Sequence, residues 1–199
     1  MTAIAAMMAK SASSAITARR AAFIDRDGVL NQDLGYVHRW RDFRWLPGAI
    51  SALAALQQQG FALVVVTNQS GIGRGMYTEA AVDALHGHMR EALREQGVAL
   101  TDICVCPHHP QALLPQYRQL CDCRKPRPGM ILRAAREHGL QLAGSRLFGD
   151  KPSDIQAGRA AGVGCCWLIG SEAVAVACGA DGAAASLQSA VHALRDRAI

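Results

Sequence analysis

The sequence predicts an α/β fold, a three-layer, doubly wound parallel sheet with helices on both faces. Short apolar runs alternate with helical patterns along most of the 199 residues, which is typical of parallel strands joined by right-handed crossovers. The run over residues 61–66 is apolar throughout, as expected for a strand that is covered on both faces. Polar side chains directly follow several apolar runs, where the carboxyl ends of such strands form a binding site.

The apolar runs and their boundaries define the expected elements in order. Five runs are expected to be strands, at residues 21–24, 61–66, 103–105, 146–148 and 163–169. Each intervening helix begins at a proline or a capping side chain and ends at a glycine. The four helices lie between Pro47 and Gly60, Thr78 and Gly97, Pro128 and Gly139, and Ser153 and Gly162. A last helix is expected through Leu187, Val191 and Leu194, and any sixth strand is faint.

Composition excludes two classes of protein. Half of the residues are hydrophobic, which is enough for one sizeable core and too many for a disordered chain. No apolar run approaches the ~20 residues that cross a bilayer, so an integral membrane protein is excluded. The net charge of +5 is dispersed, and it fits a small anionic ligand at least as well as nucleic acid.

We expect one domain over residues 21–199, preceded by a flexible leader at residues 1–20. The leader carries its charges after its apolar part, unlike a secretory signal, which favours a cytoplasmic location. Seven cysteines are an odd number, and four of them lie between Cys104 and Cys123. This pattern indicates reduced thiols and a metal site rather than a disulfide framework.

Two carboxylates, Asp25 and Asp27, follow the first expected strand. At this spacing both can face one side, and close carboxylates need a cation or a shared proton to offset their repulsion. Mg²⁺ prefers oxygen ligands and commonly accompanies phosphate, so one Asp can be a nucleophile and the other a general acid and base. The alternative is a solvated Asp-Gly turn. Asp150 follows the fourth strand as a third oxygen ligand, whereas Asp154 is equally explained by a helix N-terminus.

The stretch from Thr67 to Gly75 supplies hydroxyl and amide donors. Its glycines let backbone N–H groups approach an anion. It matches neither the Walker loop nor the dinucleotide-binding fingerprint, and a plain glycine-rich turn is the alternative.

A Cys-x-His…Cys-x-Cys set spans residues 106–123, in what we call the zinc loop. Three thiolates and an imidazole suit tetrahedral zinc, and four protein ligands leave no open position, so such a site is structural. The expected ligands are Cys106, His108, Cys121 and Cys123. The alternative is a coincidence of buried or reactive cysteines.

Two cations, Arg124 and Lys125, directly follow the zinc loop, and Pro126 stiffens its exit. A loop without an anchor would lose entropy on each binding event. We therefore hypothesise that zinc pre-organises Arg124 and Lys125 over the anion site, against the alternative of a solvated basic loop.

Asp25-x-Asp27, Thr67, Lys125 and Asp150, in that order, resemble the haloacid dehalogenase-like phosphatases. The resemblance covers roughly residues 21–170 and implies the Rossmann-like fold of that family, without room for a large cap domain. It implies that Asp25 becomes an aspartyl-phosphate while Asp27 protonates the leaving alkoxide and then deprotonates water. Thr67 and Lys125 would hold the transferring phosphoryl oxygens. Mg²⁺ would be bound by the Asp25 side chain, the Asp27 carbonyl oxygen and Asp150.

The zinc loop followed by Arg-Lys-Pro resembles two branches of the family, which act on heptose bisphosphate and on histidinol phosphate. Residues 35–38, 67–75 and 106–110 look most like the heptose branch. That resemblance implies hydrolysis of the C7 phosphate of D-glycero-β-D-manno-heptose 1,7-bisphosphate, on the route to ADP-heptose and lipopolysaccharide. The substrate-binding residues expected from it and from the motifs above are Asn31, Asp33, Tyr36, His38, Thr67, Asn68, Gln69, Ser70, Arg124, Lys125 and Lys151.

Two alternatives stay open. A histidinol-phosphate phosphatase would share the catalytic residues, and Asp33 and Asp42 are available for its cationic leaving group. A zinc-dependent binding module without catalysis would explain the Cys/His set but not the shared placement of the acidic residues and Lys125. We expect a monomer that acts on a small sugar bisphosphate, with neither nucleic acid nor a membrane as partner.

Overall fold

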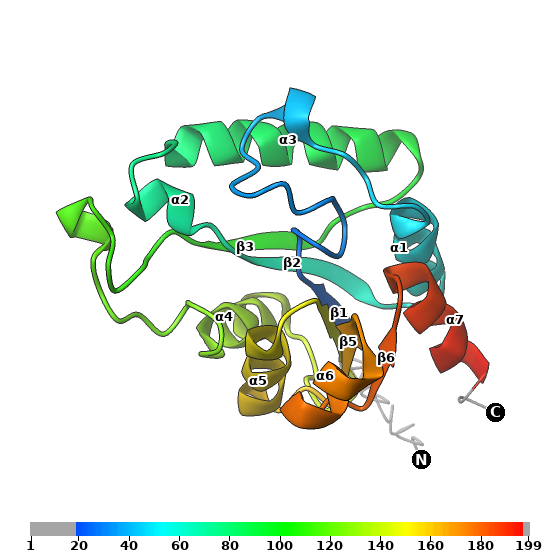
Figure 1. The fold of residues 1–199 in the computed structure, drawn as a ribbon. Helices are drawn as coiled ribbons and strands as arrows, with labels where there is room; N and C mark the ends of the chain where they lie inside the picture. Colours follow the sequence, from blue (N-terminus) through cyan, green and yellow to red (C-terminus); the bar gives the residue numbers. More distant parts are fainter. Residues whose placement is uncertain (1–18, 197–199) are drawn as a thin grey trace, which may run out of the picture.

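A computed structural model describes residues 19–196 (Figure 1). Residues 1–18, which make up most of the expected leader, lie outside the described residues. Arg19 and Arg20 both contact the domain. Arg19 forms a parallel bridge with Leu140, and Nη2 of Arg20 donates to the carbonyl oxygen of Gln59 at 2.8 Å.

The strands form one parallel sheet in the order β3-β2-β1-β4-β5-β6. Their bounds are Ala21–Ile24 (β1), Ala62–Asn68 (β2), Asp102–Cys106 (β3), Arg146–Gly149 (β4), Cys165–Ile169 (β5) and Gly182–Ala184 (β6). The five expected strands are present, and the faint sixth is a short edge strand. The chain moves outward from β1 to β3 and then returns to β4 on the other side of β1, so the strand order reverses beside β1. Ligands of doubly wound folds bind at such a reversal.

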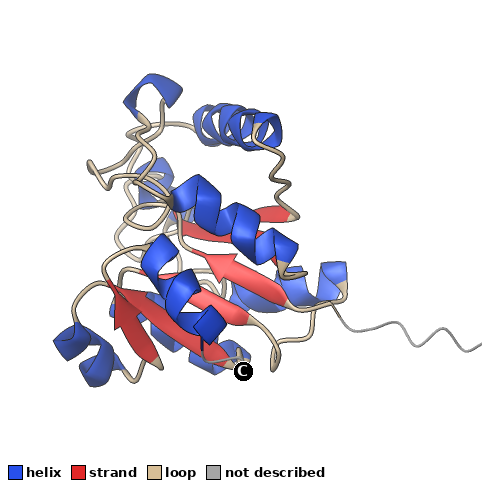
Figure 2. Ribbon diagram, turned by 90° about the vertical axis from the view of Figure 1, so that its right-hand side faces the viewer, coloured by secondary structure: helices blue, strands red, loops and turns tan. Residues whose placement is uncertain are grey.

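Helices cover both faces of the sheet, so the predicted three layers are present (Figures 1 and 2). Helices α1, α3 and α7 pack on one face, and α4, α5 and α6 pack on the other. Their bounds are Ala49–Gln58 (α1), Ser70–Gly73 (α2), Glu79–Glu95 (α3), Gly129–His138 (α4), Pro152–Ala161 (α5), Glu172–Cys178 (α6) and Leu187–Asp196 (α7), with single 3-10 turns at Trp40–Asp42 and Pro115–Tyr117.

The continuous apolar runs are explained by two cores, one on each face of the sheet. In β1, Ala22 and Ile24 belong to one core, and Ala21 and Phe23 belong to the other. All four side chains are fully buried. Successive side chains of a strand point to opposite faces, so a strand covered on both sides is apolar at every position.

Most helix boundaries agree with the sequence patterns. The hydroxyl of Thr78 accepts a hydrogen bond from the backbone N–H of Ala81 at 3.2 Å, and Gly139 ends α4 with a left-handed φ of 62°. The expected cap at Ser153 is wrong. Helix α5 begins at Pro152, with Lys151 as its N-cap residue, because the fixed φ of proline suits the first helical position.

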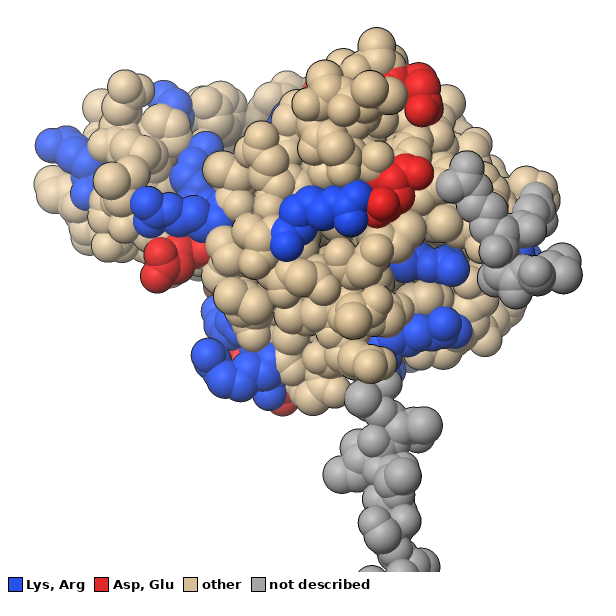
Figure 3. Space-filling view, turned by 90° about the horizontal axis from the view of Figure 1, so that it is seen from below, with Lys and Arg blue, Asp and Glu red and all other residues tan. Residues whose placement is uncertain are grey.

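Basic side chains are scattered over the face that carries α4, α5 and α6 (Figure 3). Within residues 19–196, no helix has both the length and the apolar character that crossing a membrane requires. The described connections over the carboxyl edge of the sheet are loops and short helical turns, and no large cap is formed there.

Close packing of α5 on the end of β4 predicts a stability effect at Gly149. A Cβ atom there would lie 2.2 Å from Cβ of Asp154, so Gly149→Ala must displace the first turn of α5. We expect a loss of about 1–3 kcal/mol in the free energy of unfolding, as for other overpacked sites, measured by urea denaturation.

Gly87→Ala is the matched control, because Gly87 lies inside α3 and a Cβ there meets nothing within 4 Å. Alanine in an open helical position should stabilise the protein by roughly 0.5–1 kcal/mol. Wild-type stability of Gly149→Ala would contradict the packing described here.

Candidate active site

The carboxyl ends of β1, β2 and β4 bring the acidic residues and Lys125 together. Ile24, the last residue of β1, pairs with Val65 of β2 and with Phe148 of β4. The next residue is Asp25, whose backbone N–H donates to the carbonyl oxygen of Phe148 at 2.9 Å. Lys125 enters from the long connection after β3. The three strands and this connection therefore converge on one point.

Lys125 forms a buried ion pair with two carboxylates. Its Nζ lies 2.8 Å from Oδ1 of Asp25 and 2.6 Å from Oδ1 of Asp154, and it donates to the carbonyl oxygen of Val66 at 2.8 Å. Burial lowers the pKa of Lys125, but the charges of Asp25 and Asp154 outweigh this effect and the pKa is raised. The ammonium group therefore stays charged.

Asp154 has two roles in the structure. Its Oδ2 accepts a hydrogen bond from the backbone N–H of Lys151 at 2.9 Å, at the start of α5. Its Oδ1 pairs with Lys125. The position of Asp154 at a helix start predicts only the first role, because the contact with Lys125 joins residues 29 positions apart in the sequence.

The carboxylates of Asp25, Asp150 and Asp154 form an acidic cluster in which one oxygen from each lies within 4.8 Å of the others. Burial, opposed by Lys125, raises the pKa of Asp25 to about 7, and burial also raises the pKa of Asp150. Oδ1 of Asp150 is buried and accepts no hydrogen bond from the described residues. An acceptor without a donor, beside two further carboxylates, fits a hard divalent cation such as Mg²⁺.

Gly28 closes the turn that follows Asp27. Its φ of 88° is in the left-handed region, and a Cβ atom there would lie 2.3 Å from Oδ2 of Asp150. A side chain at this position would displace Asp150 from the acidic cluster. The Asp-Gly turn and the clustered carboxylates are thus one arrangement rather than alternatives.

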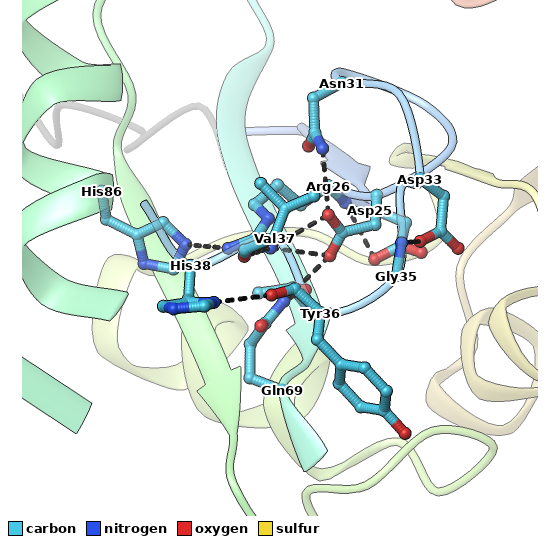
Figure 4. Close-up of polar contacts among 12 residues, drawn as sticks. Asp25, Arg26, Asn31, Asp33, Gly35, Tyr36, Val37, His38, Gln69 and His86 are labelled. Atoms are coloured by element: carbon cyan, nitrogen blue, oxygen red, sulfur yellow. Dashed lines mark hydrogen bonds and ion pairs between the residues drawn. The ribbon is translucent and has the colours of Figure 1, made fainter. Parts of the chain in front are cut away.

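Three side chains that are labelled in Figure 4, Arg26, Asn31 and Gln69, donate to the Asp27 carboxylate. Nη2 of Arg26 lies 2.9 and 2.8 Å from its two oxygens. Asn31 Nδ2 donates to Oδ1 at 3.0 Å, and Gln69 Nε2 donates to Oδ2 at 2.9 Å. One cationic and two neutral donors thus determine the orientation of the Asp27 carboxylate, and Asp27 lines a cleft at this edge of the sheet.

The Gln69 amide links Asp27 to Thr67. Its Nε2 donates to Oγ1 of Thr67 at 2.8 Å, and its Oε1 accepts from the hydroxyl of Tyr77 at 2.9 Å. The Tyr77 hydroxyl thus fixes which end of the amide faces Asp27. His38 stacks on the Tyr77 ring at 4.5 Å between centroids, and its Nδ1 contacts the carbonyl oxygen of Tyr36 at 2.8 Å.

A cleft of about 560 Å³ opens above these residues. Most of the expected substrate-binding residues line it: Asp33, Tyr36, Asn68, Gln69, Ser70, Arg124, Lys125 and Lys151. Thr67 lines a small adjoining cavity of about 50 Å³, together with Asp25 and Asp154.

Asn31 and His38 line neither cavity. Asn31 is fully buried and holds Asp27, and His38 packs against Tyr77. The structure thus buries Asn31 and leaves His38 half-buried against Tyr77, which itself lines the cleft.

The four expected zinc ligands form one cluster. Their ligand atoms all lie within 4.8 Å of one another, and Sγ of Cys123 is 3.2 Å from Sγ of Cys106 and of Cys121. Nδ1 of His108 lies 3.3 Å from Sγ of Cys123. Three sulfur atoms and one imidazole nitrogen are the donor set of a closed structural zinc site.

The zinc loop contacts Arg124 directly. Nη1 of Arg124 donates to the carbonyl oxygen of His108 at 3.2 Å, and the side chain lines the cleft. Two hydrogen bonds of 3.2 Å join the side-chain amide of Asn68 to the backbone of Lys125. The side chain of Arg124 and the backbone of Lys125 are thus held in place without a bound substrate.

Two residues of this network, Arg26 and Tyr77, are not predicted by the sequence motifs. Arg26 lies between Asp25 and Asp27 in the sequence, and its fully buried side chain contacts the Asp27 carboxylate from the interior. A charged residue at a buried position was the signal that could have found it. Tyr77 lies just before the cap of α3 and carries no local pattern that points to the site.

Comparisons with known proteins show which family the chain resembles. The sequence model of the HAD-hydrolase-like family matches residues 122–193. The D-glycero-beta-D-manno-heptose-1,7-bisphosphate 7-phosphatase of Escherichia coli K12 is 50% identical over 144 residues, which cover 72% of this chain and 75% of that protein. The D-glycero-alpha-D-manno-heptose-1,7-bisphosphate 7-phosphatase of Photorhabdus laumondii is 41% identical over 150 residues, covering 75% and 82%.

A solved structure extends the likeness to the whole fold. D,D-heptose 1,7-bisphosphate phosphatase from B. bronchiseptica, complexed with magnesium and phosphate, superposes with a TM-score of 0.78 at 33% identity and covers 90% of this chain and 99% of that one. Identity at this level over most of both chains shows the family. The chain belongs to the haloacid dehalogenase-like hydrolases, in the family that contains these heptose bisphosphate phosphatases.

Proposed function

We propose that the protein is a Mg²⁺-dependent phosphatase that removes the C7 phosphate of D-glycero-β-D-manno-heptose 1,7-bisphosphate, on the route to ADP-heptose. The observation that carries the proposal is the convergence of Asp25, Asp27 and Lys125 at the floor of a polar cleft. The relative named for the β anomer is 50% identical and the relative named for the α anomer is 41% identical, which favours β. The relatives named above act on heptose bisphosphates, so we do not favour histidinol phosphate.

In the first step, Asp25 attacks the phosphorus atom of the C7 phosphate. The contacts of Lys125 and of the Arg26 N–H both fall on Oδ1 of Asp25, so we assign the attack to Oδ2. A bond forms from Asp25 to phosphorus while the bond from phosphorus to the C7 oxygen breaks. Protonated Asp27 gives its proton to that oxygen, and heptose 1-phosphate leaves.

In the second step, water attacks the phosphorus atom of the aspartyl-phosphate. Asp27, now a carboxylate, takes a proton from the water, and the bond between phosphorus and Asp25 breaks. Inorganic phosphate is released, and both aspartates return to their starting states. Transfer of this kind depends mainly on positioning and on charge neutralisation, which Lys125 and the hydroxyl of Thr67 supply to the phosphoryl oxygens.

We assign the Mg²⁺ site to Asp25, the carbonyl oxygen of Asp27, and Asp150. The buried Oδ1 of Asp150, which lacks a donor among the described residues, supports this assignment. Bound Mg²⁺ would neutralise negative charge on the carboxylates and the phosphoryl group. Asp154 lies in the acidic cluster but is engaged by Lys125, so we give it the role of holding Lys125.

The cleft suits a polyhydroxylated, doubly phosphorylated substrate. Arg124 and Lys151 supply positive charge, and Asp33, Asn68 and Ser70 supply hydrogen-bonding groups for hydroxyls. Nζ of Lys151 lies 3.2 Å from Oδ2 of Asp33, which ties the loop after β1 to the start of α5.

The cytoplasmic location and the monomeric state of the protein stay predictions.

We propose that Zn²⁺ occupies the four-ligand cluster of the zinc loop and has a structural role. A closed tetrahedral site offers no position for substrate or water. Its effect on the reaction passes through Arg124, which donates to the carbonyl oxygen of His108.

Phosphate release tests the substrate assignment. With Mg²⁺ present, we expect kcat/KM for the β anomer of heptose 1,7-bisphosphate to exceed that for the α anomer and for histidinol phosphate by about 10-fold or more. The measurement compares initial rates at matched concentrations. A larger kcat/KM for histidinol phosphate would overturn the substrate assignment and leave the catalytic residues unchanged.

Asp25→Asn tests the nucleophile. The amide cannot form an aspartyl-phosphate, so we expect kcat to fall by a factor on the order of 10³ or more, measured as phosphate release. Asp42→Asn is the control, because the Asp42 side chain is half exposed and lies in a 3-10 turn; it should keep the wild-type rate. An Asp25→Asn protein that turns over normally would refute the mechanism.

Cys121→Ser tests the zinc loop. We expect elemental analysis to find about one zinc per wild-type chain and little in the variant. Because Arg124 then loses its anchor, KM for the bisphosphate should rise more than kcat falls. Cys178→Ser, outside the cluster, should retain both zinc and KM. A zinc-free variant with wild-type KM would show that the metal does not contribute to substrate binding.

A further inference from the structure

Arg26 is a cation whose side chain has no exposed surface. Its Nη2 contacts both carboxylate oxygens of Asp27 and donates to the carbonyl oxygen of Val37 at 2.6 Å. Its Nη1 lies 3.1 Å from Nε2 of His86. A buried charge is costly unless it is paired and hydrogen-bonded, so these partners are what hold the guanidinium in the interior.

His86 reaches Arg26 from α3, on the opposite side from the cleft. Helix α3 buries an apolar stripe that includes Leu85 and Met89, and His86 is a polar member of that buried face, with 6% of its surface exposed. Figure 4 shows its ring pointing from the helix toward Arg26. His86 lines neither the cleft nor the small cavity that holds Thr67.

The chemistry of the contact determines the state of the ring. A guanidinium can only donate, so Nε2 of His86 accepts and the proton is on Nδ1. Burial, together with the charges of Arg26 and Arg90, lowers the pKa of His86 to about 3. The ring is therefore neutral throughout the physiological range, and its acceptor is always available.

The planar guanidinium of Arg26 connects His86 to Asp27. Nη1 and Nη2 belong to one rigid fork, so holding Nη1 determines where Nη2 lies. The Val37 carbonyl contacts Nη2 and not Nη1, so without His86 the guanidinium could turn about that contact. The pair of contacts, at His86 and at Val37, fixes both ends.

We propose that His86 is a positioning residue for the reaction. Through Arg26 it holds the Asp27 carboxyl group where that group exchanges protons with the leaving oxygen and with water. The inference rests on the proposed phosphatase function and goes beyond it, because it assigns a role in proton transfer to a residue of α3 that does not touch the substrate.

Leaving groups distinguish positioning from a merely structural role. The C7 oxygen of a heptose leaves as an alkoxide and needs a proton from Asp27, whereas p-nitrophenolate leaves without one. A displaced Asp27 should therefore slow release of the sugar much more than release of p-nitrophenolate. A damaged fold should slow both equally.

The experiment measures the first step alone, by single-turnover release of the leaving group with enzyme in excess. The substrates are heptose 1,7-bisphosphate and p-nitrophenyl phosphate, and rates are normalised to folded protein. His86→Met removes the acceptor at similar volume. His86→Gln puts an amide oxygen near the place of Nε2. His88→Met is the control, because His88 is exposed on the same helix.

We expect His86→Met to slow release of the sugar about 10-fold or more, part of the ~10²–10⁴ that general acid catalysis supplies, and to slow release of p-nitrophenolate much less. The enzyme concentration at half-saturation should change little, His86→Gln should recover most of the rate, and His88→Met should match wild type. Equal losses on both esters, equal losses in the Met and Gln variants, or an unchanged Met variant would each overturn the inference.

Crystal structures of wild type and His86→Met separate this inference from the proposed function. If wild type hydrolyses neither ester, the phosphatase proposal fails, and the structures still test the positioning. We expect the Arg26 guanidinium to move off Asp27 in the variant. An Arg26–Asp27 pair that keeps its geometry without His86 would overturn the inference.

Discussion

The ion pair of Lys125 with Asp25 and Asp154 is the interaction on which the rest of the site depends. It joins the end of β1, the connection after β3 and the first turn of α5 through one buried ammonium group. Carboxylates this close repel one another in a medium of low dielectric constant unless a cation lies between them. Without Lys125, burial would raise the pKa of Asp25 further, because no nearby cation would oppose it.

A second constraint holds Asp27 apart from this cluster. Asp25 contacts Lys125, whereas Asp27 receives its hydrogen bonds from Arg26, Asn31 and Gln69. Two carboxylates separated by one residue thus have different electrostatic surroundings. The polar interior works as a unit, because a buried network is stable only when its members are satisfied.

The loops over the sheet take the place of a cap domain. The zinc loop anchors Arg124 at the cleft, and the contact between Lys151 and Asp33 closes the other side. A metal ion bound by the four ligands would hold such a loop in place without the additional hydrophobic core that a separate cap would require. The cleft remains open to solvent, which suits a charged and hydroxylated substrate.

The sequence by itself determined the layers, the positions of five strands, the placement of Asp25, Thr67 and Asp150 at strand ends, and the spacing of the four candidate zinc ligands. These features follow from local patterns, because strand period, caps and ligand spacing are properties of neighbouring residues. Only the tertiary structure decided that Asp154 binds Lys125, that Arg26 and His86 lie behind Asp27, and that Asn31 and His38 lie outside the cleft lining. Those contacts mostly join distant parts of the chain, and the packing of α3 and α5 on the sheet determines which polar groups meet.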